Sequence, residues 1–127
     1  MNGCENKAMA FSCRSISKTF TTRNGEVTAL QAFDLSVQEE EFVCIIGPSG
    51  CGKTTTLRII GGFVEPNEGD VFFDGVKINH LPPYKRQVNT IFQRYALFPH
   101  LNIYENIAFG LRIGKKPERE IKERVTE

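Results

Sequence analysis

The stretch Gly47-Pro48-Ser49-Gly50-Cys51-Gly52-Lys53-Thr54 matches the pattern G-x-x-x-x-G-K-[ST] at every fixed position. The apolar, β-branched run before it, residues 42–46, is typical of a parallel strand buried on both faces. The residues after Lys53 continue without a helix breaker as far as Gly61-Gly62, which predicts a short helix with a glycine stop. Strand, glycine-rich loop and helix in this order predict an α/β fold of the P-loop NTPase type.

The fixed positions of this loop each have a chemical reason. Glycines let the backbone turn so that successive N–H groups face an anion, at a helix N-terminus whose dipole adds partial positive charge. Lys53 is expected to reach the β- and γ-phosphates, the Thr54 hydroxyl to ligate Mg²⁺, and Thr55 to hydrogen-bond near the α-phosphate. The nucleotide-binding residues predicted in this way are Gly47, Pro48, Ser49, Gly50, Cys51, Gly52, Lys53, Thr54 and Thr55.

Cysteine usage indicates free thiols. Cys4, Cys13, Cys44 and Cys51 form no C-x-x-C pair, and no histidine lies near them at zinc-ligand spacing. A reducing cytosol is therefore the simpler interpretation. Cys51, inside the loop, leaves two interpretations open: a redox role for its thiol, or a small side chain that keeps the backbone donors accessible.

Composition excludes several classes of protein. The chain has 127 residues, the size of one domain, with 40% hydrophobic and 24% charged residues, which argues against disorder. A net charge of +1 makes nucleic acid an unexpected partner. Neither a signal-peptide core nor an apolar run of membrane-spanning length occurs, so we expect a soluble, unexported chain that meets a membrane only through a partner.

Turn sequences predict two hairpins, one on each side of the loop. Asn24-Gly25 separates two strand-like runs, and Asp74-Gly75 separates two further short ones. Residues 33–37 alternate between apolar and polar side chains, as a half-buried strand does.

The C-terminal part of the chain is predicted to be a strand followed by helices. Residues 88–92 form a short apolar run that ends at Gln93. Asn102, with Glu105 three residues later, predicts a capped helix that runs to Gly110. Pro117 is placed to open a last helix, in which charged residues pair at a spacing of four.

These segments resemble a known family, the ATP-binding subunits of ABC importers. The loop and its helix look like the family's Walker A region, and residues 88–101 look like its Q-loop, which continues into residues 104–112. The resemblance covers residues 11–127, behind an N-terminal tail of residues 1–10. It implies the N-terminal part of an ABC-type nucleotide-binding domain, with an antiparallel β subdomain and the start of a parallel-sheet core.

The resemblance also implies roles for residues outside the loop. It assigns Gln93 to Mg²⁺ and to the attacking water, so that Lys53 and Gln93 are the expected catalytic residues and Thr54 and Gln93 the expected metal ligands. Phe20 matches the aromatic that stacks on adenine in this family; an ordinary core aromatic is the alternative. The implied cofactors are ATP and Mg²⁺.

The same resemblance implies partners and a location. The segment after Gln93 is expected to contact transmembrane permease subunits, and a second nucleotide-binding subunit is expected head to tail, with a solute-binding protein engaged indirectly. The chain would lie peripherally at the cytoplasmic face of the cell membrane. Residues 88–112 are most similar to polyamine (spermidine/putrescine) importers, whereas residues 18–30 look closer to sulfonate- or nitrate-type importers.

Two other functions stay open. A non-catalytic ATP-binding module would bind nucleotide without turnover, and an importer ATPase could serve another solute such as iron or a sugar. A P-loop kinase or GTPase is disfavoured because no Asn-Lys-x-Asp sequence occurs and because Gln93 lies 40 residues after Lys53, the expected Q-loop spacing.

Some expected parts of the family's machinery do not occur in the 127 residues. The sequence contains no Leu-Ser-Gly-Gly-Gln signature, no later apolar strand that ends in Asp-Glu, and no switch histidine after Arg112. We therefore expect this chain by itself to hydrolyse ATP negligibly, since the transition-state charge and the nucleophile would both lack a partner. We also expect residues 42–46 and 88–92 to lack neighbours and to favour aggregation.

Overall fold

A computed structural model describes residues 8–127 of the chain, which divide into two compact units. The first unit ends at Thr90 and the second runs from Ile91 to Glu127. Residues 1–7 of the predicted tail, with Cys4, lie outside the described residues.

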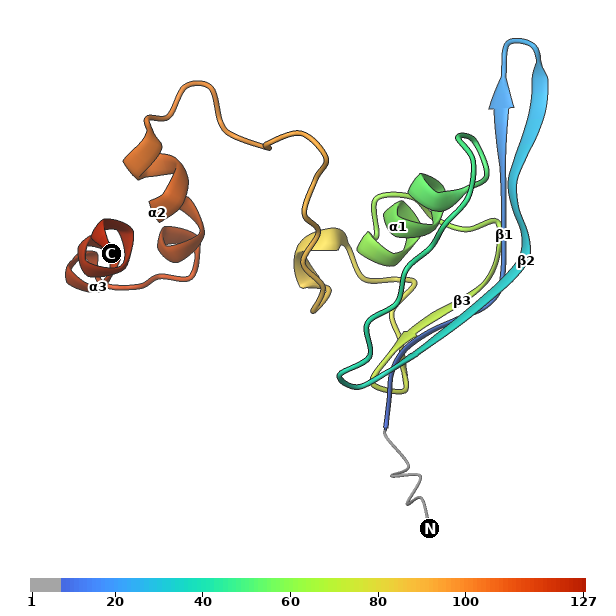
Figure 1. Ribbon diagram of the computed structural model, residues 1–127, viewed down its shortest axis with the longest axis horizontal. Helices are drawn as coiled ribbons and strands as arrows, with labels where there is room; N and C mark the ends of the chain where they lie inside the picture. The colour runs from blue at the N-terminus through green and yellow to red at the C-terminus, as the bar shows by residue number, and fades with distance from the viewer. Residues whose placement is uncertain (1–7) are drawn as a thin grey trace. The chain divides into compact units, whose positions relative to one another are not determined.

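An antiparallel sheet of four strands organises the first unit (Figure 1). The strands are β1 (Met9–Thr22), β2 (Gly25–Gln38), β3 (Glu68–Phe73) and β4 (Val76–Lys77), in the order β2-β1-β3-β4. Both predicted hairpins are confirmed, since β1 pairs with β2 and β3 with β4. The glycines that follow Asn24 and Asp74 have φ of 113° and 76°, backbone conformations that disfavour other residues.

The pairing of β1 with β2 is interrupted at several places. The register shifts four times along the pair, including the steps from Cys13 to Ile16 and from Ile16 to Lys18. Ser15 and Ala32 have φ of 50° and 46°, as residues in bulges do. The predicted alternation of residues 33–37 is confirmed, because the apolar members are half-buried and the polar ones exposed.

Helix α1 (Lys53–Gly61) packs on this sheet through a compact apolar core. The core consists of Cys13, Ile16, Leu30, Ile59, Val71 and Ile78. The predicted glycine stop is confirmed: Gly62 is the C-cap residue, with φ of 83°, and its N–H donates to the carbonyls of Arg58 and Ile59. A short 3-10 helix, η1 (Pro83–Lys85), follows β4.

Burial suppresses the chemistry of the one cysteine in this core. Burial of the Cys13 side chain, and to a smaller extent the charge of Asp34, raises the pKa of the Cys13 thiol to about 11. The thiol is protonated at neutral pH and contributes packing. Cys44 and Cys51, by contrast, are exposed.

The two strands predicted at residues 42–46 and 88–92 are wrong for this structure. Both segments are irregular, and most of their apolar side chains are exposed, for example Phe42 by 90%, Ile46 by 92% and Ile91 by 97%. A strand draws its stability from hydrogen bonds to neighbouring strands and from cover on its faces. Among residues 8–127 no strand pairs with either segment, so their sequence pattern is not realised as β structure.

Two helices make up most of the second unit, α2 (Ile103–Ile113) and α3 (Glu118–Thr126). The predicted capping box is confirmed: Oδ1 of Asn102 accepts from the Glu105 N–H at 2.9 Å, and Oε2 of Glu105 accepts from the Asn102 N–H at 3.0 Å. Helix α2 continues past the predicted end at Gly110. Of the predicted charge pairs in α3, Glu120 and Arg124 form an ion pair at 2.8 Å, whereas Glu118 pairs with Arg112.

No helix in residues 8–127 is both long and apolar enough to cross a membrane. This finding holds for both units.

Replacing Asn102 with Ala is expected to destabilise the start of α2 by about 1 kcal/mol, because the Glu105 N–H loses its acceptor. The measurement is amide hydrogen exchange at residues 103–106. Asn89→Ala, at an exposed and irregular position, is the matched control. Equal exchange in the two variants would contradict the role of the cap.

Candidate nucleotide-binding site

The glycine-rich loop leads directly into α1, as predicted from the sequence. Gly52 is the N-cap residue with φ of 95°, and Gly50 has φ of 80°, so both occupy the left-handed region that favours glycine. The first N–H groups of any helix have no acceptor within the helix. At the start of α1 these donors face the loop, where an anion can accept from them.

The Lys53 side chain folds back over the loop. Its ammonium donates to the carbonyl of Gly47 and, at 2.7 Å, to the carbonyl of Pro48, and it lies 3.3 Å from Sγ of Cys51. The positive charge is thereby held among the backbone groups of the loop. A phosphate bound to the loop would give this ammonium a negatively charged acceptor. Such a charge-assisted hydrogen bond is stronger than one to a neutral carbonyl.

A cavity of about 270 Å³ lies between the loop and β2. The loop side is the predicted one, since the lining includes Ser49, Gly50, Gly52, Lys53, Thr54 and Thr55. The opposite wall comes from Val27, Thr28 and Ala29 of β2, which the sequence did not single out. The available sequence signal was the turn at Asn24-Gly25, which directs β2 back toward the loop. A local turn pattern does not predict the tertiary contact between β2 and the loop.

Gly52 is where the loop touches the sheet. A Cβ built on Gly52 would lie 2.6 Å from the carbonyl oxygen of Ala29 and 2.9 Å from Cδ2 of Leu30. Gly50 shows the contrast: a Cβ there has nothing within 4 Å. The glycine at position 52 is therefore required by both space and φ, and the one at position 50 by φ alone.

Phe20 lies beside the cavity wall. It is the register partner of Val27 across the β1–β2 pair, so the two side chains share a face of the sheet. Phe20 is 37% exposed, and Nζ of Lys18 lies 5.3 Å from the centre of its ring. Phe20 is not one of the residues that line the cavity. Its stacking on adenine stays a prediction.

Gln93 belongs to the second unit. It lies in an irregular, exposed segment, whereas Lys53 and Thr54 belong to the first unit. Six of the nine predicted loop residues line the cavity of the first unit, and Gly47, Pro48 and Cys51 do not. The roles of Gln93 in metal binding and catalysis therefore stay predictions.

The second unit contains an apolar groove of about 650 Å³ in the segment after Gln93. Its lining is Leu97, Phe98, Pro99, Leu101, Asn102, Ile103, Tyr104, Asn106 and Ile107. Asn106 holds its shape: Oδ1 accepts from the Phe98 N–H at 2.8 Å, and Nδ2 donates to the carbonyls of Leu101 and Asn102 at 3.0 and 2.9 Å. These hydrogen bonds of Asn106 hold in place the backbone that forms the groove.

Thr54 is the loop's candidate metal ligand. Its hydroxyl side chain is exposed and lines the cavity. In residues 8–127 no group of three or more His, Cys, Asp or Glu side chains is arranged to hold a metal. A hydroxyl oxygen is a ligand type that Mg²⁺ accepts, and the role of Thr54 in metal binding stays a prediction.

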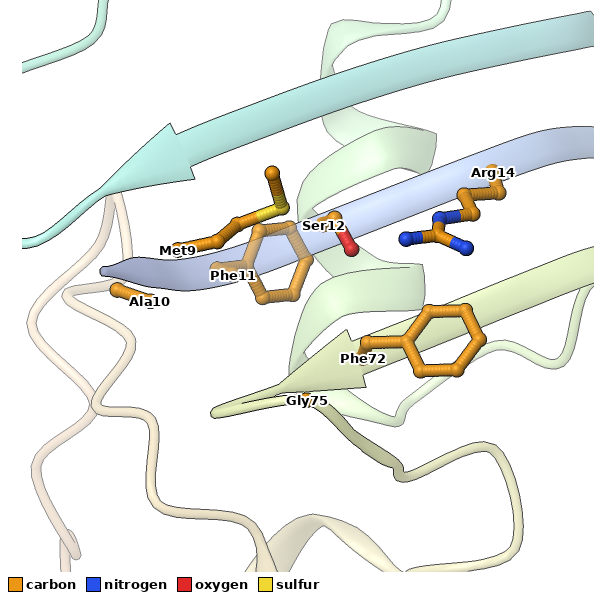
Figure 2. Close-up of a pocket in the computed structure, with 7 residues that line it drawn as sticks. All are labelled: Met9, Ala10, Phe11, Ser12, Arg14, Phe72 and Gly75. Carbon is orange, nitrogen blue, oxygen red and sulfur yellow. The ribbon is translucent and has the colours of Figure 1, made fainter. Parts of the chain in front are cut away.

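A further hollow of about 360 Å³ lies on the sheet (Figure 2). The guanidinium carbon of Arg14, on β1, lies 5.0 Å from the centre of the Phe72 ring on β3, and the two side chains lie next to each other in Figure 2. Met9 and Phe11 also line this hollow. It contains none of the predicted nucleotide-binding residues.

A family model described as ABC transporter matches residues 30–127, which include the loop, α1 and the whole second unit. The chain belongs to the ABC transporter family. Its match to this family and its similarity to solved ATP-binding cassettes confirm the predicted fold class, an N-terminal portion of an ABC-type P-loop NTPase domain.

Two curated relatives have the same name. The chain is 55% identical over 117 residues to the spermidine/putrescine import ATP-binding protein PotA of Clostridium novyi, covering 92% of this chain and 33% of that protein. It is 54% identical over 114 residues to the PotA of Clostridioides difficile, covering 90% and 32%. The chain spans about a third of the length of these relatives.

Solved structures agree on the fold. The ATP-binding cassette MJ0796, in a dimeric post-hydrolysis state bound to ADP and Pi, matches with a TM-score of 0.80 and 32% identity, covering 91% of this chain and 54% of that one. A nucleotide-free cassette from an ABC transporter matches with a TM-score of 0.54 and 35% identity, covering 59% and 28%.

Replacing Gly52 with Ala is expected to lower the free energy of unfolding more than replacing Gly50 does. Gly50→Ala costs the strain of a positive φ, about 1–2 kcal/mol. Gly52→Ala adds the collision with Ala29 and should cost about 1–3 kcal/mol more. Urea unfolding of the two variants measures the difference. Equal costs would show that the loop does not rest on the sheet.

Proposed function

We propose that the chain binds ATP with Mg²⁺ in its phosphate loop, as part of the energy-coupling ATPase subunit of an ABC importer for polyamines. The observation that carries the proposal is the cavity between the loop and β2, which brings Lys53, Thr54 and Thr55 to one place. The names of the PotA relatives support the solute, spermidine or putrescine.

Each loop residue has a task in this proposal. The N–H groups of the loop and of the first turn of α1 donate to the phosphate oxygens, apart from the Cys51 N–H, which donates to the Pro48 carbonyl. The Lys53 ammonium neutralises the β- and γ-phosphates. The Thr54 hydroxyl and Gln93 hold Mg²⁺, which supplies charge neutralisation of the triphosphate when bound. Gln93 orients the attacking water through its amide, and Phe20 stacks on adenine.

The second unit supplies the contact to the transporter in this proposal. Its groove is lined by apolar side chains, with Leu97 67%, Ile103 81% and Ile107 54% exposed, and it suits an amphipathic helix of a permease subunit. A solute-binding protein would act through that permease. The chain would therefore lie at the cytoplasmic face of the cell membrane without entering it.

A second nucleotide-binding subunit completes the proposed assembly. The MJ0796 cassette, which resembles this chain, was solved as a dimer with ADP and Pi. A head-to-tail dimer would supply to this loop the signature that the 127 residues do not contain. Residues 9–127 would act in it as the N-terminal part of one domain, because β1 begins at Met9, inside the predicted tail of residues 1–10.

A non-catalytic ATP-binding module is the competing function. Such a module would bind ATP, as the leading proposal also requires. The ATPase of an importer for another solute would bind ATP as well, so binding alone does not separate these functions. Phosphate release separates catalysis from binding when this chain is compared with a longer one that carries the signature and the acid. Binding by both with hydrolysis by the longer chain alone favours the ATPase.

Lys53→Ala is expected to weaken ATP binding by at least about tenfold, because the triphosphate loses its nearest cation and keeps only backbone donors. Isothermal titration of the 127-residue chain with ATP and Mg²⁺ is the measurement. Lys122→Ala, an exposed position of α3, is the matched control and should leave the Kd unchanged. A wild-type chain without measurable affinity for ATP would refute the proposed function.

The role of Phe20 is separable by the choice of ligand. Phe20→Ala is expected to weaken ATP binding by about 5–10-fold, the usual worth of an aromatic stack, and Phe20→Tyr to preserve it. Binding of inorganic tripolyphosphate, which has no adenine, should be the same in all three proteins. An equal loss for both ligands would make Phe20 a packing residue.

A further inference from the structure

Arg86 is a buried cation whose guanidinium donates to backbone carbonyls. It is 8% exposed. Its Nε donates to the Leu81 carbonyl at 2.9 Å, and its Nη1 donates to the carbonyls of Ile59 and Ile60 at 2.9 and 3.1 Å. Its Nη2 lies 3.3 Å from the Asn79 carbonyl. Three nitrogens of one side chain thus serve four carbonyls.

These acceptors come from two separate places. Ile59 and Ile60 lie in the last turn of α1, where carbonyls lack the regular donor four residues later and a cation is favoured by the helix dipole. The Ile59 carbonyl also accepts from the Gly62 N–H. Asn79 and Leu81 lie in the segment after β4. The planar guanidinium spans both, whereas the single nitrogen of a lysine cannot.

The segment after β4 is itself fixed to the sheet. Oδ1 of Asn79 accepts from the Val71 N–H at 2.7 Å, and its Nδ2 donates to the Gly69 carbonyl at 3.1 Å. Both partners belong to β3. Arg86 therefore links the C-terminal end of α1 to the central part of the sheet through one side chain and one loop.

Glycine at position 62 makes room for this contact. A Cβ built on Gly62 would lie 2.6 Å from Nε of Arg86 and 2.9 Å from its Cζ. Burial lowers the pKa of Arg86, and the charge of Glu65 opposes this shift. An arginine side chain in a protein stays charged at neutral pH. The chain thus keeps a buried charge at the end of the helix that begins at the phosphate loop.

We infer that Arg86 is a positioning residue of the nucleotide site: it holds the C-terminal end of α1 so that the N–H groups at its other end keep their direction toward the phosphates. The inference rests on the proposed binding of ATP. A rigid helix held at Gly52 on β2 and at Ile59 and Ile60 by Arg86 has both ends fixed to one sheet. If either contact is lost, α1 can change its direction, and the N–H groups of the loop change direction with it.

The test compares Arg86→Lys and Arg86→Met with Arg58→Lys, an exposed arginine of the same helix. Two quantities are measured in the 127-residue chain: the Kd for ATP with Mg²⁺, and amide hydrogen exchange at residues 50–55 without nucleotide. Both Arg86 variants should bind about fivefold or more weakly and exchange faster at residues 50–55. Arg58→Lys should change neither.

A purely structural role gives another result. Faster exchange confined to residues 57–62 and 79–90, with an unchanged Kd, would overturn the inference. Should the Arg86 variants fail to fold, Asn79→Ala releases the same brace from β3 while Arg86 stays, and the same two measurements decide. If the wild-type chain does not bind ATP, the proposed function fails, and exchange at residues 50–55 still decides whether Arg86 controls the loop.

Discussion

The close approach of Gly52 to the carbonyl of Ala29 is the constraint on which the site depends. It places the turn before α1 directly on β2, so the residues of the loop and of the strand become two walls of one cavity. A side chain at position 52 would separate those walls. Gly52 is therefore required for two reasons. Its positive φ directs the backbone N–H groups of the loop toward an anion, and its lack of a side chain permits the contact with Ala29.

Helix α1 transmits that contact to the rest of the first unit. Its N-terminus is fixed by Gly52, and its last turn is fixed by the burial of Ile59 in the core and by Arg86. A short helix has little stability of its own in water, since nucleation costs more than its few hydrogen bonds return. Its direction is accordingly set by these tertiary contacts.

Local signals were sufficient where the structure is local. The turns at Asn24-Gly25 and Asp74-Gly75, the glycine stop after α1 and the capping box at Asn102 all depend on residues a few positions apart. The sequence failed where the outcome depends on a distant neighbour. Residues 42–46 have the pattern of a buried strand but pair with no strand in residues 8–127, and the β2 wall of the cavity was not foreseen.

The interrupted pairing of β1 with β2 has a consequence for the behaviour of the chain in solution. Strand β2 is an outer strand of the described sheet, and a long, regular outer strand offers its free N–H and C=O groups to other molecules. Bulges near Ser15 and Ala32 twist the ribbon and break the spacing that a second chain would have to match. These irregularities disfavour pairing of β2 with a strand of a second chain. The surface of the first unit that favours self-association is instead its exposed apolar segments, such as residues 42–46.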